Sequence, residues 1–179
     1  HRPGQGRQQQ ELADEAGQVI DMLSYKATAA RVMIELRAPR DVSFVGDAVR
    51  WSQVIMNLTT NGIDAYDDID EASGRPRRVV VALAHTPAGC VCTVADWGSG
   101  IAPDHLSRVF DPFFTTKSCS GAAGTGIGLS IAKRIIEKDF KGRITVTSEP
   151  MTGTVFSIFL PMISVESADE AASFEPRRI

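Results

Sequence analysis

The feature that most constrains the fold of this chain is the spacing of its apolar residues. Some segments have the spacing of a helix and others the spacing of a strand, and the two kinds follow one another along the sequence. Three segments show the three- and four-residue spacing of amphipathic helices: 11–25, 47–66 and 128–138. Six shorter segments alternate apolar and polar residues, as half-buried strands do: 32–37, 42–45, 78–84, 90–95, 143–148 and 154–160. A chain of 179 residues is long enough to build one core from these elements.

The domain is expected to span residues 11–161. Residues 1–10 are polar and lack periodicity, so we expect a disordered leader there, and 162–179 is expected to be a tail or linker. Asp47 is a good N-cap for the central helix, and Pro103 suits the first turn of a short helix over 103–110.

Composition excludes several classes of function. The formal net charge of −3 provides no basic surface for nucleic acid. No apolar run approaches the roughly 20 residues that a membrane helix needs. The three cysteines, Cys90, Cys92 and Cys119, form no CxxC pair, so we expect free thiols in a reducing compartment.

Four polar residues share one face of the central helix. Gln53, Asn57, Asn61 and Asp64 are spaced by four, four and three residues. They could form an ordinary solvated face, or a cleft wall where an amide oxygen holds a hard cation. Mg²⁺ prefers such oxygen ligands and takes others from substrate phosphates and water.

Two glycine-bearing segments and an aromatic one add further candidates. Asp96 opens the turn DWGSGI at a strand end, where a carboxylate can accept a hydrogen bond from an exocyclic amine; a plain tight turn is the alternative. GTGIGL, at 124–129, opens directly into a helix and could bind phosphate through backbone amides. Its spacing fits neither a Walker loop nor a dinucleotide fingerprint. FDPFFTTK, at 110–117, is an aromatic cluster followed by Lys117, a flexible point charge.

Together and in this order, these motifs closely resemble the ATP-binding catalytic domain of sensor histidine kinases. That domain belongs to a wider group with DNA gyrase, heat-shock chaperones of the same ATPase type and mismatch-repair ATPases. Five segments carry the resemblance: the N box 53–65, the glycine boxes 96–101, 124–130 and 153–161, and the F box 110–117, whose wording is nearest to kinases of the nitrogen-regulation type. The resemblance covers 11–161 and implies a two-layer α/β (α+β) sandwich of the Bergerat type, with helices on one face of a mixed, mostly antiparallel sheet.

The resemblance also implies ATP and Mg²⁺ as ligands. Asn61 would coordinate the metal, Asp96 would accept the adenine amino group with Thr154 nearby through water, and the lid 118–123 would be anchored by Phe110 and Phe114. Asn57 and Lys117 would be the catalytic residues. The implied ATP-binding residues are Asn57, Asn61, Ala65, Asp96, Gly98, Gly100, Ile101, Phe110, Phe114, Thr116, Lys117, Gly124, Thr125, Gly126, Ile127, Gly128, Leu129 and Thr154.

Four residues depart from common versions of the motifs. Gly62 stands where alanine is usual, and Ala65 replaces a tyrosine that stacks on adenine in other branches. Asp64 occupies a position where many relatives carry a basic residue aimed at phosphate. Trp97 is bulkier than the usual residue.

Asn57 favours a kinase over a hydrolase. Gyrase-like ATPases carry at this helix position a glutamate that activates water, and an amide cannot accept a proton as a general base. The alternatives are a serine kinase of the anti-sigma type, a conformational ATPase of the gyrase or chaperone type, and a nucleotide-sensing module without catalysis.

A histidine kinase of this type implies further partners. The phosphoacceptor would lie on a separate histidine-bearing dimerisation domain, and a response regulator receiver domain would be an indirect partner. His1, His85 and His105 do not lie on a long amphipathic helix, so we expect no autophosphorylation by this chain alone. We expect a monomer that is cytoplasmic, or the cytoplasmic part of a membrane sensor.

Overall fold

The computed structural model describes residues 9–39, 43–115 and 126–162, and a five-stranded mixed sheet forms its centre. The strand order is β2-β4-β5-β7-β6. The bounds are β2 Met33–Arg37, β4 Arg78–Thr86, β5 Gly89–Asp96, β6 Arg143–Glu149 and β7 Gly153–Pro161. Only β2 and β4 pair in parallel, and the other three neighbouring pairs are antiparallel.

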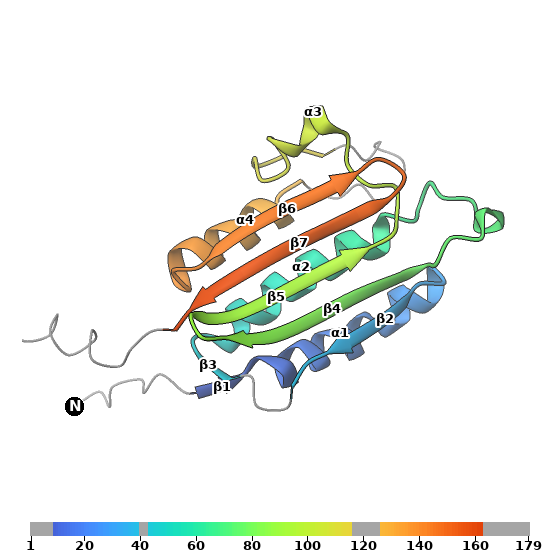
Figure 1. Ribbon diagram of the computed structural model, residues 1–179. Helices are drawn as coiled ribbons and strands as arrows, with labels where there is room; N and C mark the ends of the chain where they lie inside the picture. The colour runs from blue at the N-terminus through green and yellow to red at the C-terminus, as the bar shows by residue number, and fades with distance from the viewer. Residues whose placement is uncertain (1–8, 40–42, 116–125, 163–179) are drawn as a thin grey trace, which may run out of the picture.

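The main helices cover one face of this sheet (Figure 1). They are α1 (Leu12–Ala29), α2 (Ala48–Asp64) and α4 (Gly128–Arg134), which continues into the π-helical turn η2 (Ile135–Asp139). The short α3 (Pro103–Leu106) lies beside the end of β6 (Figure 1). The predicted fold class, a two-layer sandwich with helices on one face of a mostly antiparallel sheet, is confirmed.

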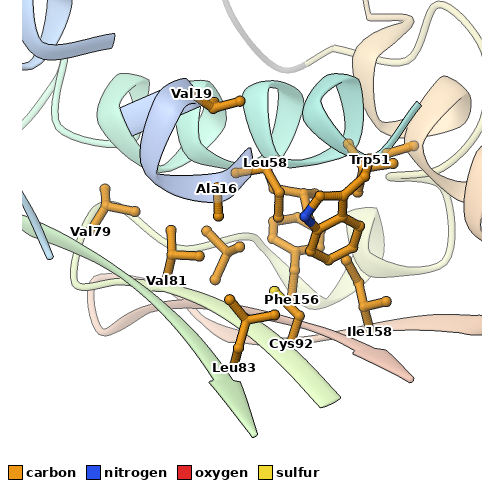
Figure 2. Close-up of a cluster of buried hydrophobic side chains, with 14 of the residues drawn as sticks. Ala16, Val19, Trp51, Leu58, Val79, Val81, Leu83, Cys92, Phe156 and Ile158 are labelled. Carbon is orange, nitrogen blue, oxygen red and sulfur yellow. The ribbon is translucent and has the colours of Figure 1, made fainter. Parts of the chain in front are cut away.

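The core lies between the helices and the sheet. Figure 2 shows Leu58 and Trp51 of α2 above alternating side chains of the strands, among them Val81 and Phe156. Burying the apolar stripe of each helix against one face of a sheet removes large side chains from water, which is the main favourable term in folding. Cys90 and Cys92 are both buried free thiols. They lie two residues apart on β5, so their side chains point to the same face of the sheet.

Several boundaries differ from the sequence prediction because tertiary contacts extend the elements. Helix α1 continues past residue 25 to Ala29, since Ala27 is buried against the core. Strands β4 and β5 leave only 87–88 as their turn, which places His85 in a strand rather than a loop. Gln9 and Gln10, assigned above to the leader, pair in β1 (Gln9–Glu11) with β3 (Ser43–Val45).

The start of helix α2 was predicted correctly from its N-cap residue. The Asp47 side chain accepts hydrogen bonds from the amides of Val49 and Arg50, at 2.9 and 3.1 Å, so it is the predicted N-cap. The predicted helix over 103–110 is shorter, because α3 ends at Leu106 and turns follow it. The loop 67–77 contains the 3-10 helix η1 (Glu71–Ser73). None of the helices in the described ranges has the length and apolar character needed to cross a bilayer.

Candidate functional site

A cavity of about 330 Å³ opens between the C-terminal half of α2, the N-terminus of α4 and the ends of β5 and β7. This volume lies within the range of small-molecule sites. The lining residues are Asn57, Thr60, Asn61, Asp64, Ala65, Asp68, Asp96, Ser99, Gly100, Ile101, Val109, Phe114, Thr115, Gly126, Gly128, Leu129, Thr154 and Phe156. The polar helix face and all three glycine-bearing segments named from the sequence therefore meet at one place.

Most of the expected binding residues that the structure describes line this cavity. They are Asn57, Asn61, Ala65, Asp96, Gly100, Ile101, Phe114, Gly126, Gly128, Leu129 and Thr154. The expected residues Thr116, Lys117, Gly124 and Thr125, and the expected lid 118–123, lie outside the described residues.

Three expected residues, Gly98, Phe110 and Ile127, are not among the lining residues. A Cβ atom at Gly98 would come within 2.5 Å of the Cβ of Ala65, so glycine lets the turn pack closely on the end of α2. The ring of Phe110 packs edge-on against Phe156 with centroids 6.2 Å apart. Ile127 caps α4, and its carbonyl accepts a hydrogen bond of 2.8 Å from the Ser130 hydroxyl. Gly98 and Phe110 therefore pack against the lining residues Ala65 and Phe156, whereas Ile127 begins the helix that follows.

Asp96 is the buried charge of the cavity. It ends β5 with only 7% of its surface exposed, and its Oδ1 accepts a hydrogen bond of 2.9 Å from the Gly98 amide. Burial raises the pKa of this carboxyl to about 6, although hydrogen bonds from the backbone amides of Gly98 and Thr154 act in the opposite direction. A carboxylate held in this way gains most from a ligand that donates a hydrogen bond.

The α2 wall presents amides and carboxylates to the cavity. Asn57, Asn61 and Asp64 line it, whereas Gln53, one turn earlier on the helix, is exposed. The Asn57 side-chain Nδ2 donates to the carbonyl oxygen of Gly128 at 3.0 Å, which ties α2 to the start of α4. That carbonyl can only accept, so residue 57 must supply a donor there.

Six lining residues were not singled out from the sequence: Thr60, Asp68, Ser99, Val109, Thr115 and Phe156. The spacing of residues in the sequence could have identified two of them. Thr60 follows Asn57 by three residues on the same helix face, and Phe156 follows Thr154 by two residues on one strand face. Asp64 belongs to the polar row predicted on α2 but was not expected to bind ATP, and its Oδ1 lies 2.5 Å from the ammonium of Lys26 on α1.

The structure also explains Trp97. The guanidinium carbon of Arg78 lies 4.2 Å from the centre of its ring, a cation–π contact. The backbone amide of Trp97 donates to the Tyr66 hydroxyl at 2.9 Å, and that hydroxyl donates to the Arg78 carbonyl at 2.8 Å. The bulky residue and its partners therefore hold the chain between Asp96 and Gly98 in place.

Comparisons with known proteins agree with this geometry. A family model described as histidine kinase-, DNA gyrase B- and HSP90-like ATPase matches residues 46–164. The sensor histidine kinase ZraS of Salmonella typhi is 35% identical over 147 residues, covering 81% of this chain and 29% of that protein. The sensor kinase CckA of Brucella abortus is 36% identical over 162 residues, covering 85% of this chain and 17% of that protein.

A solved structure shows the same fold. The catalytic domain of histidine kinase ThkA superposes with a TM-score of 0.71 at 24% identity, covering 86% of this chain and 94% of that one. The chain spans less than a third of the length of the two curated relatives named above.

Proposed function

The chain belongs to the family of histidine kinase-, DNA gyrase B- and HSP90-like ATPases, and on that premise we propose that it is the catalytic domain of a sensor histidine kinase. It binds ATP with Mg²⁺ in the cavity and transfers the γ-phosphoryl group to a histidine on a separate dimerisation domain. A response regulator receiver domain takes the group afterwards, and the domain works in the cytoplasm.

Asp96 is the observation that carries the proposal. A buried carboxylate at the closed end of a cavity suits a ligand with an exocyclic amine, such as the adenine amino group. Ile101 and Phe156, which also line the cavity, offer apolar surface to a flat base. The cavity is therefore chemically complementary to the base of ATP.

The part of the cavity between α2 and the start of α4 suits phosphates and a metal ion. The side-chain oxygen of Asn61 is the kind of ligand that Mg²⁺ accepts, and within the described ranges no cluster of three or more His, Cys, Asp or Glu could hold a metal. Asn61 would thus share the ion with the nucleotide and with water. When bound, Mg²⁺ neutralises phosphate charge, and the backbone at Gly126 and Gly128 allows close approach of phosphate oxygens.

The contact of Asn57 with Gly128 supports a kinase over a hydrolase. A glutamate at position 57 would direct an acceptor at the Gly128 carbonyl, where the structure needs the donor that Asn57 supplies at 3.0 Å. Without a base at this position, water is poorly activated and the γ-phosphoryl group is kept for another acceptor. In the transfer an imidazole nitrogen bonds to the γ-phosphorus, the bond to the bridging oxygen breaks, ADP leaves and the imidazole loses its proton.

Calorimetry with a non-hydrolysable ATP analogue, with and without Mg²⁺, tests the binding part of this proposal. We expect wild type to bind, and we expect Asn61→Asp to change the dependence on Mg²⁺ while Gln53→Glu, an equal charge change at an exposed site of α2, does not. A histidine-bearing dimerisation domain supplied in trans should then become phosphorylated. If wild type does not bind the analogue at concentrations up to millimolar, the proposal is wrong.

A further inference from the structure

Ser148 of β6 is the centre of a small hydrogen-bond network behind the closed end of the cavity. Its Oγ accepts from the Ile101 amide at 2.8 Å and donates to the Gly153 carbonyl at 2.8 Å. The Oγ1 of Thr154 lies 2.9 Å from the same Ser148 oxygen. The sheet register brings these groups together, because Thr154 of β7 lies opposite Ser148 in β6 and opposite Asp96 in β5.

Counting hydrogens shows which way the Thr154 hydroxyl points. A serine hydroxyl has one hydrogen and can accept two hydrogen bonds. The Gly153 carbonyl is only an acceptor, so it takes the Ser148 hydrogen, while the Ile101 amide uses one acceptor position. The contact between Ser148 and Thr154 is then a hydrogen bond only if Thr154 is the donor.

The consequence lies in the cavity itself. Thr154 lines the cavity and is 4% exposed, and with its hydrogen directed at Ser148 it offers only lone pairs to a ligand. Asp96 beside it, when ionised, is also an acceptor. This end of the cavity therefore presents two acceptors side by side, which match an amino group and oppose a carbonyl oxygen.

We propose that Ser148 is a positioning residue for base specificity: by binding the Thr154 hydrogen, it makes the site select a 6-amino purine over a 6-oxo purine. Ser148 is not among the lining residues, so it acts through Thr154. This inference rests on the proposed function, since it specifies which nucleotide the same cavity accepts.

The test compares the affinities of ATP and ITP, which differ at the 6-position of the base, for wild type and variants. Ser148→Ala frees the Thr154 hydroxyl to turn its hydrogen into the cavity. We expect the preference for ATP over ITP to fall about tenfold, the equivalent of one hydrogen bond gained or lost. Ser148→Thr keeps the hydroxyl and should keep the preference. Thr145→Ala, at an exposed position of the same strand, should leave it unchanged.

A second variant avoids the backbone groups that Ser148 satisfies. Thr154→Val removes the hydroxyl but leaves the bonds of Ser148 to Ile101 and Gly153, so it should weaken ATP binding without improving ITP binding. Equal loss of affinity for both nucleotides in Ser148→Ala, or an unchanged ratio in Thr154→Val, would overturn this inference alone. A wild type that binds neither nucleotide would remove the proposed function with it.

Discussion

The two ends of the cavity are built in different ways. The closed end is made by strands: Asp96 and Thr154 lie opposite each other in neighbouring strands and are 7% and 4% exposed. The open end is made by the middle of helix α2 and the start of α4, where Asn57 and Asn61 are only partly buried. Interactions at the closed end are desolvated and therefore strong, whereas those at the open end are weakened by water. Substitutions should therefore have larger effects at the closed end.

The largest effect is expected for nucleotide affinity in Asp96→Asn. The substitution keeps the acceptor for the Gly98 amide but removes the charge that the base would meet. Hydrogen bonds to a buried charged group contribute about 1.5–3 kcal/mol, so calorimetry should show a loss on the order of 100-fold. Asp104→Asn, at an exposed position of α3, is the matched control and should bind normally. Retained affinity in Asp96→Asn would contradict the assignment of this end to the base.

The same variant should be more stable than wild type when no nucleotide is present. Because burial raises the Asp96 pKa from 3.8 to about 6, the folded state binds the proton more tightly than the unfolded state. The stability that this provides is full below about pH 4 and is lost as the pH rises through 6. Asp96→Asn removes this loss, so we expect its unfolding free energy to exceed that of wild type by about 3 kcal/mol at pH 8.

Denaturant unfolding at several pH values measures that difference. The gap between Asp96→Asn and wild type should close as the pH falls from 8 to 4. A gap that stays constant with pH would mean that the carboxyl does not titrate as its burial requires.

An intermediate effect is expected for Asn57→Asp, where the open end meets α4. The new carboxylate would face the Gly128 carbonyl at the position where Nδ2 now donates at 3.0 Å. Losing this hydrogen bond and placing a carboxylate against a carbonyl oxygen costs about 1–3 kcal/mol, so thermal unfolding should show a lower midpoint. Gln53→Glu introduces the same charge one turn away at an exposed site and should change stability by less than about 0.5 kcal/mol. If both substitutions lower the unfolding midpoint equally, the added charge alone explains the effect and the hydrogen bond does not.

The smallest effect is expected for Lys26→Ala. The ammonium of Lys26, with 43% of its side chain exposed, is paired with Asp64 at the cavity wall. Partly exposed ion pairs contribute at most about 1 kcal/mol, so nucleotide affinity should fall only about threefold as the Asp64 charge loses this partner. The double variant Lys26→Ala with Asp64→Asn should regain affinity. Failure of the second substitution to restore binding would show that Lys26 does not act through Asp64.

The sequence by itself determined what depends on nearest neighbours along the chain. Helical spacing placed Asn57, Asn61 and Asp64 on one face of α2, and the Asp47 cap marked the start of that helix. The glycine-bearing motifs marked three other cavity segments, and their order supported the resemblance to histidine kinases that the family match confirmed. These signals are local, because side-chain direction and capping depend on residues a few positions apart.

Only the tertiary structure decided which of these residues reach the cavity. Gln53 belongs to the same polar row but is exposed, while Gly98 and Phe110 support the walls without lining them. The bond from Asn57 to Gly128 and the network around Ser148 join segments that are distant in sequence, at 71 residues and up to 47 residues apart. Strand register and helix packing set these contacts by burying the whole core at once, and that global balance cannot be read from any single segment.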